Sequence, residues 1–260
     1  MGRKALKPLQ QRLAIGIEYD GTAYNGWQSQ PHAPSIQDTL NEALSAVADG
    51  PVECAGAGRT DSGVHATGQV AHFDTEATRS NRSWLLGINS NLPDDVSVLW
   101  VQTVGDDFHA RFSARSRSYR YIILNREVRS ALQRHRAWWF RHELDLDNMQ
   151  AGADLLSGQH DFTSFRAASC QSKSAVRTIT DLRVTRAEDY IHIDCTADAF
   201  LHHMVRNIVG SLVRVGQGDE PVAWIQQILD SRDRKHMGLT APAAGLTLTA
   251  VDYPAEILPR

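Results

Sequence analysis

The alternation of hydrophobic and polar residues predicts a strand and then a helix near the start of the chain. Residues 12–19 alternate small or apolar with polar positions, which is typical of a half-buried strand, and Asp20 and Gly21 follow as a turn signal. Ser35 is suited to cap a helix, because its hydroxyl can accept a hydrogen bond from a free backbone N–H. After it, apolar residues recur at helical spacing on one stripe, at Ile36, Leu40, Leu44 and Val47. The Asp-Gly-Pro sequence at 49–51 ends the predicted helix.

Strand and helix patterns continue to alternate through the rest of the chain. Further strands are predicted at residues 52–57, 69–74, 96–104, 117–124, 179–186, 190–197 and 246–253. Further helices are predicted at residues 84–88, 146–156, 202–215 and 221–229.

This rhythm favours the α+β class, with two similar halves that each hold a mainly antiparallel sheet flanked by helices. The two sheets are expected to join side by side. We place the boundary near residue 112, which gives an N-terminal half of residues 1–112 and a C-terminal half of residues 113–260. The similarity between the halves is too weak to prove a duplication.

Composition narrows the class of protein without indicating a function. The 260 residues are 42% hydrophobic and 22% charged, close to globular averages, which excludes collagen-like, coiled-coil and low-complexity chains. No apolar run approaches the roughly 18 residues that a spanning helix needs, and residues 1–20 lack the apolar core of an export signal. Cys54, Cys170 and Cys195 are odd in number and form no CxxC pair, which supports neither a disulfide framework nor a zinc cluster. We therefore expect a protein of the reducing cytoplasm.

Positive charge is concentrated in one segment of the chain. Between residues 111 and 136 eight arginines stand against a single glutamate, although the whole chain has a formal net charge of -3. Tyr119 and Tyr121 lie among them, and the period of a strand places both on one face with Arg117. Such a segment is typical of a surface that contacts phosphates and stacks on bases. The structural alternative is a strand edge protected by charge.

The glycine-rich segment 55–73, AGAGRTDSGVHATGQVAHF, is the strongest candidate for chemistry. Its glycines surround Arg59 and Asp61, so the backbone can bend tightly and approach a ligand. An aspartate beside glycine also commonly bonds its own backbone in a turn, and these residues alone leave that alternative open. The glycine spacing matches no phosphate-binding loop, and the chain has no GxSxG elbow.

Histidine spacing gives no sign of a metal site. His202 and His203 are adjacent, and on the predicted helix 202–215 their side chains would point about 100° apart. A pair separated by four residues shares one metal far better. We therefore predict no metal ligands.

Several longer blocks resemble one known family over nearly the whole chain. They are IEYDGTAYNGWQ from Ile17, SIQDTL from Ser35, GRTDSGVHATGQV from Gly58, NLPDDV from Asn91, DDFHARFSARSRSYRY from Asp106, DFTSFR from Asp161, FLHHMVRNIVG from Phe200 and GLTLTAVDYP from Gly245. In content and order they are similar to the tRNA pseudouridine synthase A (TruA) family. The resemblance implies the pseudouridine synthase fold. It also implies a homodimeric isomerase, without cofactor or metal, that converts uridines 38, 39 and 40 of the tRNA anticodon arm into pseudouridine.

The resemblance further implies roles for individual residues. Asp61 would be the catalytic carboxylate, which either attacks C1′ of the ribose or takes a proton from C2′. Arg206 would pair with that carboxylate and keep it ionised, and Arg59 would position the flipped nucleotide. Tyr119 would stack on the uracil, with Leu246 on the other side.

A uridine inside a stacked stem must first be extruded, which costs about a few kcal/mol. We expect Arg111, Arg115 and Arg120 to contact phosphates and offset this cost. The chain departs from the family pattern at Ser62, where alanine is more usual, and in the pair 55–56 before the motif. A noncatalytic RNA-binding module and an aspartyl-nucleophile hydrolase are the alternative functions, although the hydrolase lacks a recognisable metal or phosphate cradle.

Overall fold

The computed structural model describes residues 10–258, and its centre is a ten-stranded sheet. The strand order is β4-β1-β3-β10-β5-β9-β8-β7, with β2 paired to β3 and β6 paired to β5. No helix within residues 10–258 is both long enough and apolar enough to cross a membrane. The prediction that no export signal is present depends partly on residues 1–9, which lie outside the described residues.

The predicted strands and helices are confirmed, with boundaries that differ by a few residues. The first half contains β1 (Gln11–Tyr19), α1 (Ile36–Ala48), β2 (Cys54–Gly56), β3 (His65–Thr75), α2 (Asn81–Asn91) and β4 (Val96–Val104). The second contains β5 (Ser116–Asn125), β6 (Trp138–Phe140), α3 (Leu146–Asp154), β7 (Gly158–Asp161), β8 (Val176–Ala187), β9 (Tyr190–Ala197), α4 (Met204–Gln217), α5 (Ala223–Ser231) and β10 (Leu246–Asp252). Short 3₁₀ turns lie at Gly21–Ala23, Thr163–Phe165, Arg234–His236 and Ala243–Gly245. The sequence pattern did not predict β6 and β7, which have only three and four residues.

Local chemistry explains where α1 begins and ends. The Ser35 hydroxyl oxygen accepts a hydrogen bond from the backbone N–H of Asp38 at 3.1 Å, as predicted for the cap. Asp49 ends the helix in the left-handed region, with φ of 57°. The apolar stripe of α1 is buried in a hydrophobic core that includes residues of both halves.

The end of the chain lies in the middle of the sheet. β10 pairs parallel with β3 and antiparallel with β5, so it joins strands of the two predicted halves. The approach to β3 is close: a Cβ on Gly68 would lie 2.2 Å from the carbonyl oxygen of Thr249, so only glycine fits there. The mainly antiparallel sheet and its side-by-side join are thus confirmed, whereas the boundary between 1–112 and 113–260 stays a prediction.

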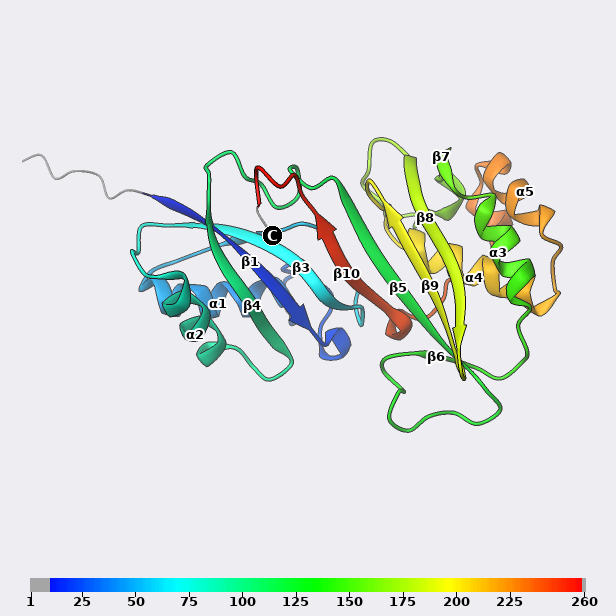
Figure 1. The fold of residues 1–260 in the computed structure, drawn as a ribbon, viewed down its shortest axis with the longest axis horizontal. Helices are drawn as coiled ribbons and strands as arrows, with labels where there is room; N and C mark the ends of the chain where they lie inside the picture. Colours follow the sequence, from blue (N-terminus) through cyan, green and yellow to red (C-terminus); the bar gives the residue numbers. More distant parts are fainter. Residues whose placement is uncertain (1–9, 259–260) are drawn as a thin grey trace, which may run out of the picture.

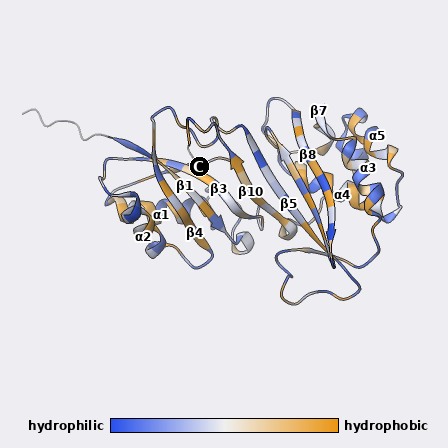
Figure 2. Ribbon diagram, viewed as in Figure 1, coloured by the Kyte–Doolittle hydropathy of each residue, from blue (hydrophilic) through white to orange (hydrophobic). Residues whose placement is uncertain are grey.

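The helices gather at the two ends of the sheet. α1 and α2 lie beside β1 and β4, whereas α3, α4 and α5 lie beside β8 and β9 (Figure 1). Hydrophobic and hydrophilic residues alternate along β8 (Figure 2), as expected for a strand with one buried face.

Candidate active site

A cleft of about 1180 Å³ lies between the glycine-rich loop and the start of α4. Its lining includes six of the site residues predicted from the sequence: Arg59, Asp61, Arg111, Tyr119, Arg206 and Leu246. These residues come from both halves of the chain. The shared sheet therefore brings together groups up to 187 positions apart in the sequence, from Arg59 to Leu246.

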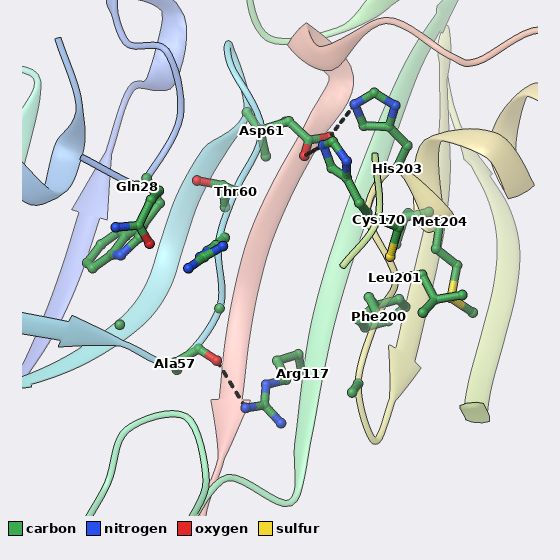
Figure 3. Close-up of a pocket in the computed structure, with 18 of the residues that line it drawn as sticks. Gln28, Ala57, Thr60, Asp61, Arg117, Cys170, Phe200, Leu201, His203 and Met204 are labelled. Atoms are coloured by element: carbon green, nitrogen blue, oxygen red, sulfur yellow. Dashed lines mark hydrogen bonds and ion pairs between the residues drawn. The ribbon is translucent and has the colours of Figure 1, made fainter. Parts of the chain in front are cut away.

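The loop that carries Asp61 is fixed on both sides. The carbonyl oxygen of Thr60 accepts a hydrogen bond from the N–H of Trp27 at 3.0 Å. The hydroxyl groups of Thr60 and Tyr19 lie 2.8 Å apart in a buried hydrogen bond. Gly63 turns the chain with φ of 75°, a conformation that favours glycine. Asp61 therefore sits on a loop that is held in place, and its carboxylate faces the cleft (Figure 3).

Arg206 is the charged partner of Asp61. Nη1 of Arg206 lies 3.1 Å from Oδ2 of Asp61, and the two side chains are only 15% and 17% exposed. Nε of Arg206 donates to the carbonyl oxygen of Ala241 at 2.8 Å, which fixes the direction of the guanidinium. Arg206 is therefore a largely buried member of the cleft and not an arginine exposed on a helix surface. The guanidinium is thus held beside the carboxylate, and the two groups form an ion pair.

Two histidines also face Asp61, and the prediction that they diverge on a helix is wrong. α4 begins at Met204, and His203 has a left-handed backbone with φ of 63°. This bend brings the two rings to a centroid distance of 4.1 Å. Nε2 of His202 lies 3.2 Å from Oδ1 of Asp61. Nε2 of His203 lies 3.5 Å from Oδ2, and Figure 3 shows the His203 ring next to Asp61. Burial lowers the pKa of His203 below its usual value, against the opposing charge of Asp61.

Tyr119 and Leu246 form an apolar wall of the cleft and are 8% and 5% exposed. The Tyr119 ring packs edge-on against Phe200 at a centroid distance of 5.0 Å. Its hydroxyl lies 3.9 Å from the position of a Cβ on Gly58, and therefore beside the loop that carries Asp61. Burial raises the pKa of Tyr119 well above its ordinary value, so the hydroxyl is protonated at neutral pH.

Comparison with known proteins identifies the family. The family described as tRNA pseudouridine synthase matches residues 15–113 and 153–254. A relative named tRNA pseudouridine synthase A from Colwellia psychrerythraea is 55% identical over 250 residues, or 96% of each chain. Relatives of the same name from Hydrogenovibrio crunogenus and Pectobacterium atrosepticum are 52% and 53% identical, over 95% and 94% of this chain and 95% and 87% of theirs. The chain belongs to the tRNA pseudouridine synthase family.

The family gives the reaction class and the fold. Pseudouridine synthases are isomerases, and this chain is an isomerase that acts on tRNA. Its α+β architecture is the pseudouridine synthase fold. The resemblance inferred from the sequence blocks is confirmed over nearly the whole chain.

Some of the arginines expected to contact the tRNA line the cleft, and others lie outside it. Arg111 is exposed and lines the cleft, as does Arg59. Arg120 is on the opposite side of β5 from Tyr119 and pairs with Asp194 through two hydrogen bonds of 2.7 and 3.0 Å. Arg115 is 63% exposed and lies 3.7 Å from Glu256. Arg115 and Arg120 are outside the cleft lining, and their phosphate contacts stay a prediction.

Arg117 also lines the cleft, and the sequence indicated only which face of its strand it lies on. It is 8% exposed, and all four hydrogen bonds of its guanidinium found in the described residues go to backbone carbonyl oxygens. They are those of Ala57 at 3.0 Å, Arg111 at 2.6 Å, Ala114 at 3.4 Å and Asp198 at 3.0 Å. Burial lowers the pKa of Arg117. The Arg117 side chain therefore links three segments of the chain, at residues 57, 111–114 and 198. Figure 3 shows its hydrogen bond to Ala57.

Replacing Arg117 by methionine is expected to destabilise the fold by about 2 kcal/mol, because four hydrogen bonds are lost and the buried carbonyl of Ala57 loses the guanidinium as its donor. Equilibrium unfolding in urea measures this change. Arg115→Met is the matched control, since an exposed arginine in a long ion pair contributes less than about 0.5 kcal/mol. Equal losses of stability in the two variants would contradict a special role for Arg117.

Proposed function

We propose that this isomerase acts on uridines 38, 39 and 40 of the tRNA anticodon stem-loop, with Asp61 as the catalytic group. One observation carries this proposal: the carboxylate of Asp61 lies in a large cleft and is paired with Arg206 at 3.1 Å. The family name gives tRNA as the substrate class. The choice of the three positions is supported by the resemblance of the sequence blocks.

The reaction needs no redox or energy-carrying partner. The bond between C1′ and N1 breaks, the uracil turns, and C1′ bonds to C5. The C5 proton then leaves and N1 gains a proton, so substrate and product have the same atoms. Asp61 either attacks C1′ or takes a proton from C2′, and both routes use its carboxylate, which Arg206 contacts at 3.1 Å.

Tyr119 is proposed to stack on the uracil, with Leu246 packing on the other side. Both side chains line the cleft and are almost fully buried, as an apolar slot for a flat base requires. The protonated Tyr119 hydroxyl can accept the C5 proton only while its own proton passes to another base. We therefore assign Tyr119 a part in a proton relay rather than the role of an isolated base.

Arg59 is proposed to position the flipped nucleotide, and Arg111 to bind a phosphate of the anticodon arm. Both guanidinium groups are exposed at the cleft, where they can reach an RNA backbone. Contacts with phosphates fix position and not sequence, which suits an enzyme that acts on three neighbouring positions.

The proposal includes a homodimer in the cytoplasm. The homodimer is supported by the family resemblance of the sequence blocks alone. A reducing compartment is supported by the free thiols of Cys54, Cys170 and Cys195. Light scattering on the purified protein measures the dimer directly.

Tritium release is the test of the position assignment. Anticodon-arm RNAs with one uridine, labelled with tritium at C5 and placed at position 38, 39 or 40, are expected to release the label into water. The same labelled uridine elsewhere in the arm is the control and is expected to keep it. Equal release from the control position would contradict the assignment. No release from any arm would favour a noncatalytic RNA-binding module, and release of free uracil would favour a hydrolase.

A further inference from the structure

We propose that Asp61, His202 and His203 form a binding site for a zinc ion, and that zinc bound there excludes the tRNA substrate. One carboxylate oxygen and one nitrogen of each imidazole lie within 4.8 Å of one another. Carboxylate oxygen and imidazole nitrogen are ordinary ligands of Zn²⁺. The binding half of this proposal is independent of the function of Asp61, whereas the inhibition half rests on the proposed function.

The separation between Asp61 and His202 fits a tetrahedral ion. Zn²⁺ holds its ligands at about 2.0–2.2 Å, so neighbouring ligand atoms of a tetrahedron are about 3.3 Å apart. Oδ1 of Asp61 lies 3.2 Å from Nε2 of His202, close to this value, and Nε2 of His203 lies 3.5 Å from the other oxygen, Oδ2. The side chain of His202 is 40% exposed, which leaves it free to adjust its distance to His203.

Neighbouring groups orient His202 and Asp61 so that both could bind one ion. The Ser169 hydroxyl lies 3.2 Å from Nδ1 of His202. When Nδ1–H donates to that hydroxyl, Nε2 carries the lone pair and faces Asp61, which is the arrangement typical of a zinc-bound histidine. Arg206 contacts Oδ2, so Oδ1 of Asp61 is the oxygen that faces His202.

The site has an open fourth position. All three side chains line the cleft, so a bound ion would present its remaining ligand to the space that the ribose needs. The two histidines and one carboxylate select a borderline-soft ion such as Zn²⁺ or Co²⁺ over Mg²⁺, which prefers six oxygen ligands. Magnesium, which tRNA itself requires, is therefore expected not to compete.

Binding is tested on tag-free protein without RNA. Calorimetric titration with Zn²⁺ is expected to show one tight site per chain, and Co²⁺ is expected to give the strong visible absorption of tetrahedral coordination. His202→Ala and His203→Ala are each expected to weaken Zn²⁺ binding by at least about tenfold. His160→Ala is the matched control, because His160 lies on β7 outside the cleft lining, and it is expected to bind like the parent protein.

Unchanged affinity in both cleft variants, or no bound zinc in the parent protein, overturns the proposed site. Asp61→Asn supplies a further check, because loss of the carboxylate is expected to weaken the visible absorption of bound Co²⁺ without unfolding the protein.

Inhibition is tested separately by tritium release at fixed Mg²⁺. Micromolar Zn²⁺ is expected to inhibit the reaction, the inhibition is expected to be competitive with the RNA, and a chelator is expected to reverse it. Zinc that binds in calorimetry but leaves the reaction unchanged overturns the inhibition while the site itself stands. Absence of any tritium release without zinc instead argues against the proposed function, so the two failures are distinct.

Discussion

Asp61→Asn is expected to reduce pseudouridine formation by more than about 10³-fold while tRNA binding is kept. An amide has nearly the shape of a carboxylate and still accepts a hydrogen bond from Arg206, so the cleft stays intact. It carries no negative charge, however, and can neither attack C1′ nor take a proton from C2′. Tritium release measures the reaction, and a filter-binding or fluorescence assay measures the affinity for tRNA.

Asp189→Asn is the matched control for this variant. Asp189 is an exposed aspartate that pairs with Arg126 at 3.3 Å and lies outside the cleft lining. Its replacement removes the same charge from the chain and is expected to leave the reaction rate within about twofold. Normal product from pure Asp61→Asn protein, or an equal loss in the control, would remove Asp61 from the catalytic role.

The sequence predicted the elements of this fold well because each carries its own local signal. The Ser35 cap and the apolar stripe after it placed α1 to within one residue. β6 and β7 were missed since three or four residues are too few to show a period. The position of β10 between β3 and β5 could not be predicted, because a local sequence pattern does not show which distant strands pair with each other.

The candidate site was predicted in part. Asp61 and Arg206 were found through family motifs, and the structure places them 3.1 Å apart. His202 and His203 were misjudged, because the helical pattern of 202–215 hides the left-handed residue before α4. The only local signal was the doubled histidine itself. The bonding of Arg117 to carbonyl oxygens was also not predictable, because backbone acceptors are the same at every residue.

Gly210 lies four residues after Arg206 on α4, where another segment of backbone comes close. A Cβ on Gly210 would lie 1.7 Å from the carbonyl oxygen of Leu239 and 3.4 Å from the nitrogen of Ala241. This same segment supplies the carbonyl of Ala241 that accepts from Arg206. Gly210 therefore positions Arg206 through a neighbouring segment of the chain.

Gly210→Ala is accordingly expected to lower both stability and activity. The added methyl group overlaps backbone that no rotamer change can relieve, and such overpacking destabilises by about 3 kcal/mol, more than the roughly 1 kcal/mol that alanine adds to a helix. Thermal unfolding is expected to shift down by about 6 °C or more. As the segment at 239–241 moves away from α4, Arg206 loses its second anchor, so tritium release is expected to fall beyond what partial unfolding explains.

Gly87→Ala provides the matched control for Gly210→Ala. Gly87 is also in a helix interior, in α2, but its added Cβ would meet the two methyl groups of the Val47 side chain at 3.1 and 3.2 Å, so a shift of only a few tenths of an ångström relieves the contact. This control is expected to change the melting temperature little and to leave the reaction unaffected, because it lies outside the cleft lining. Equal melting temperatures for the two variants would mean that the backbone at 239–241 can move away from the added methyl group at little cost in stability. In that case the contact of Ala241 would not be what holds Arg206 against Asp61.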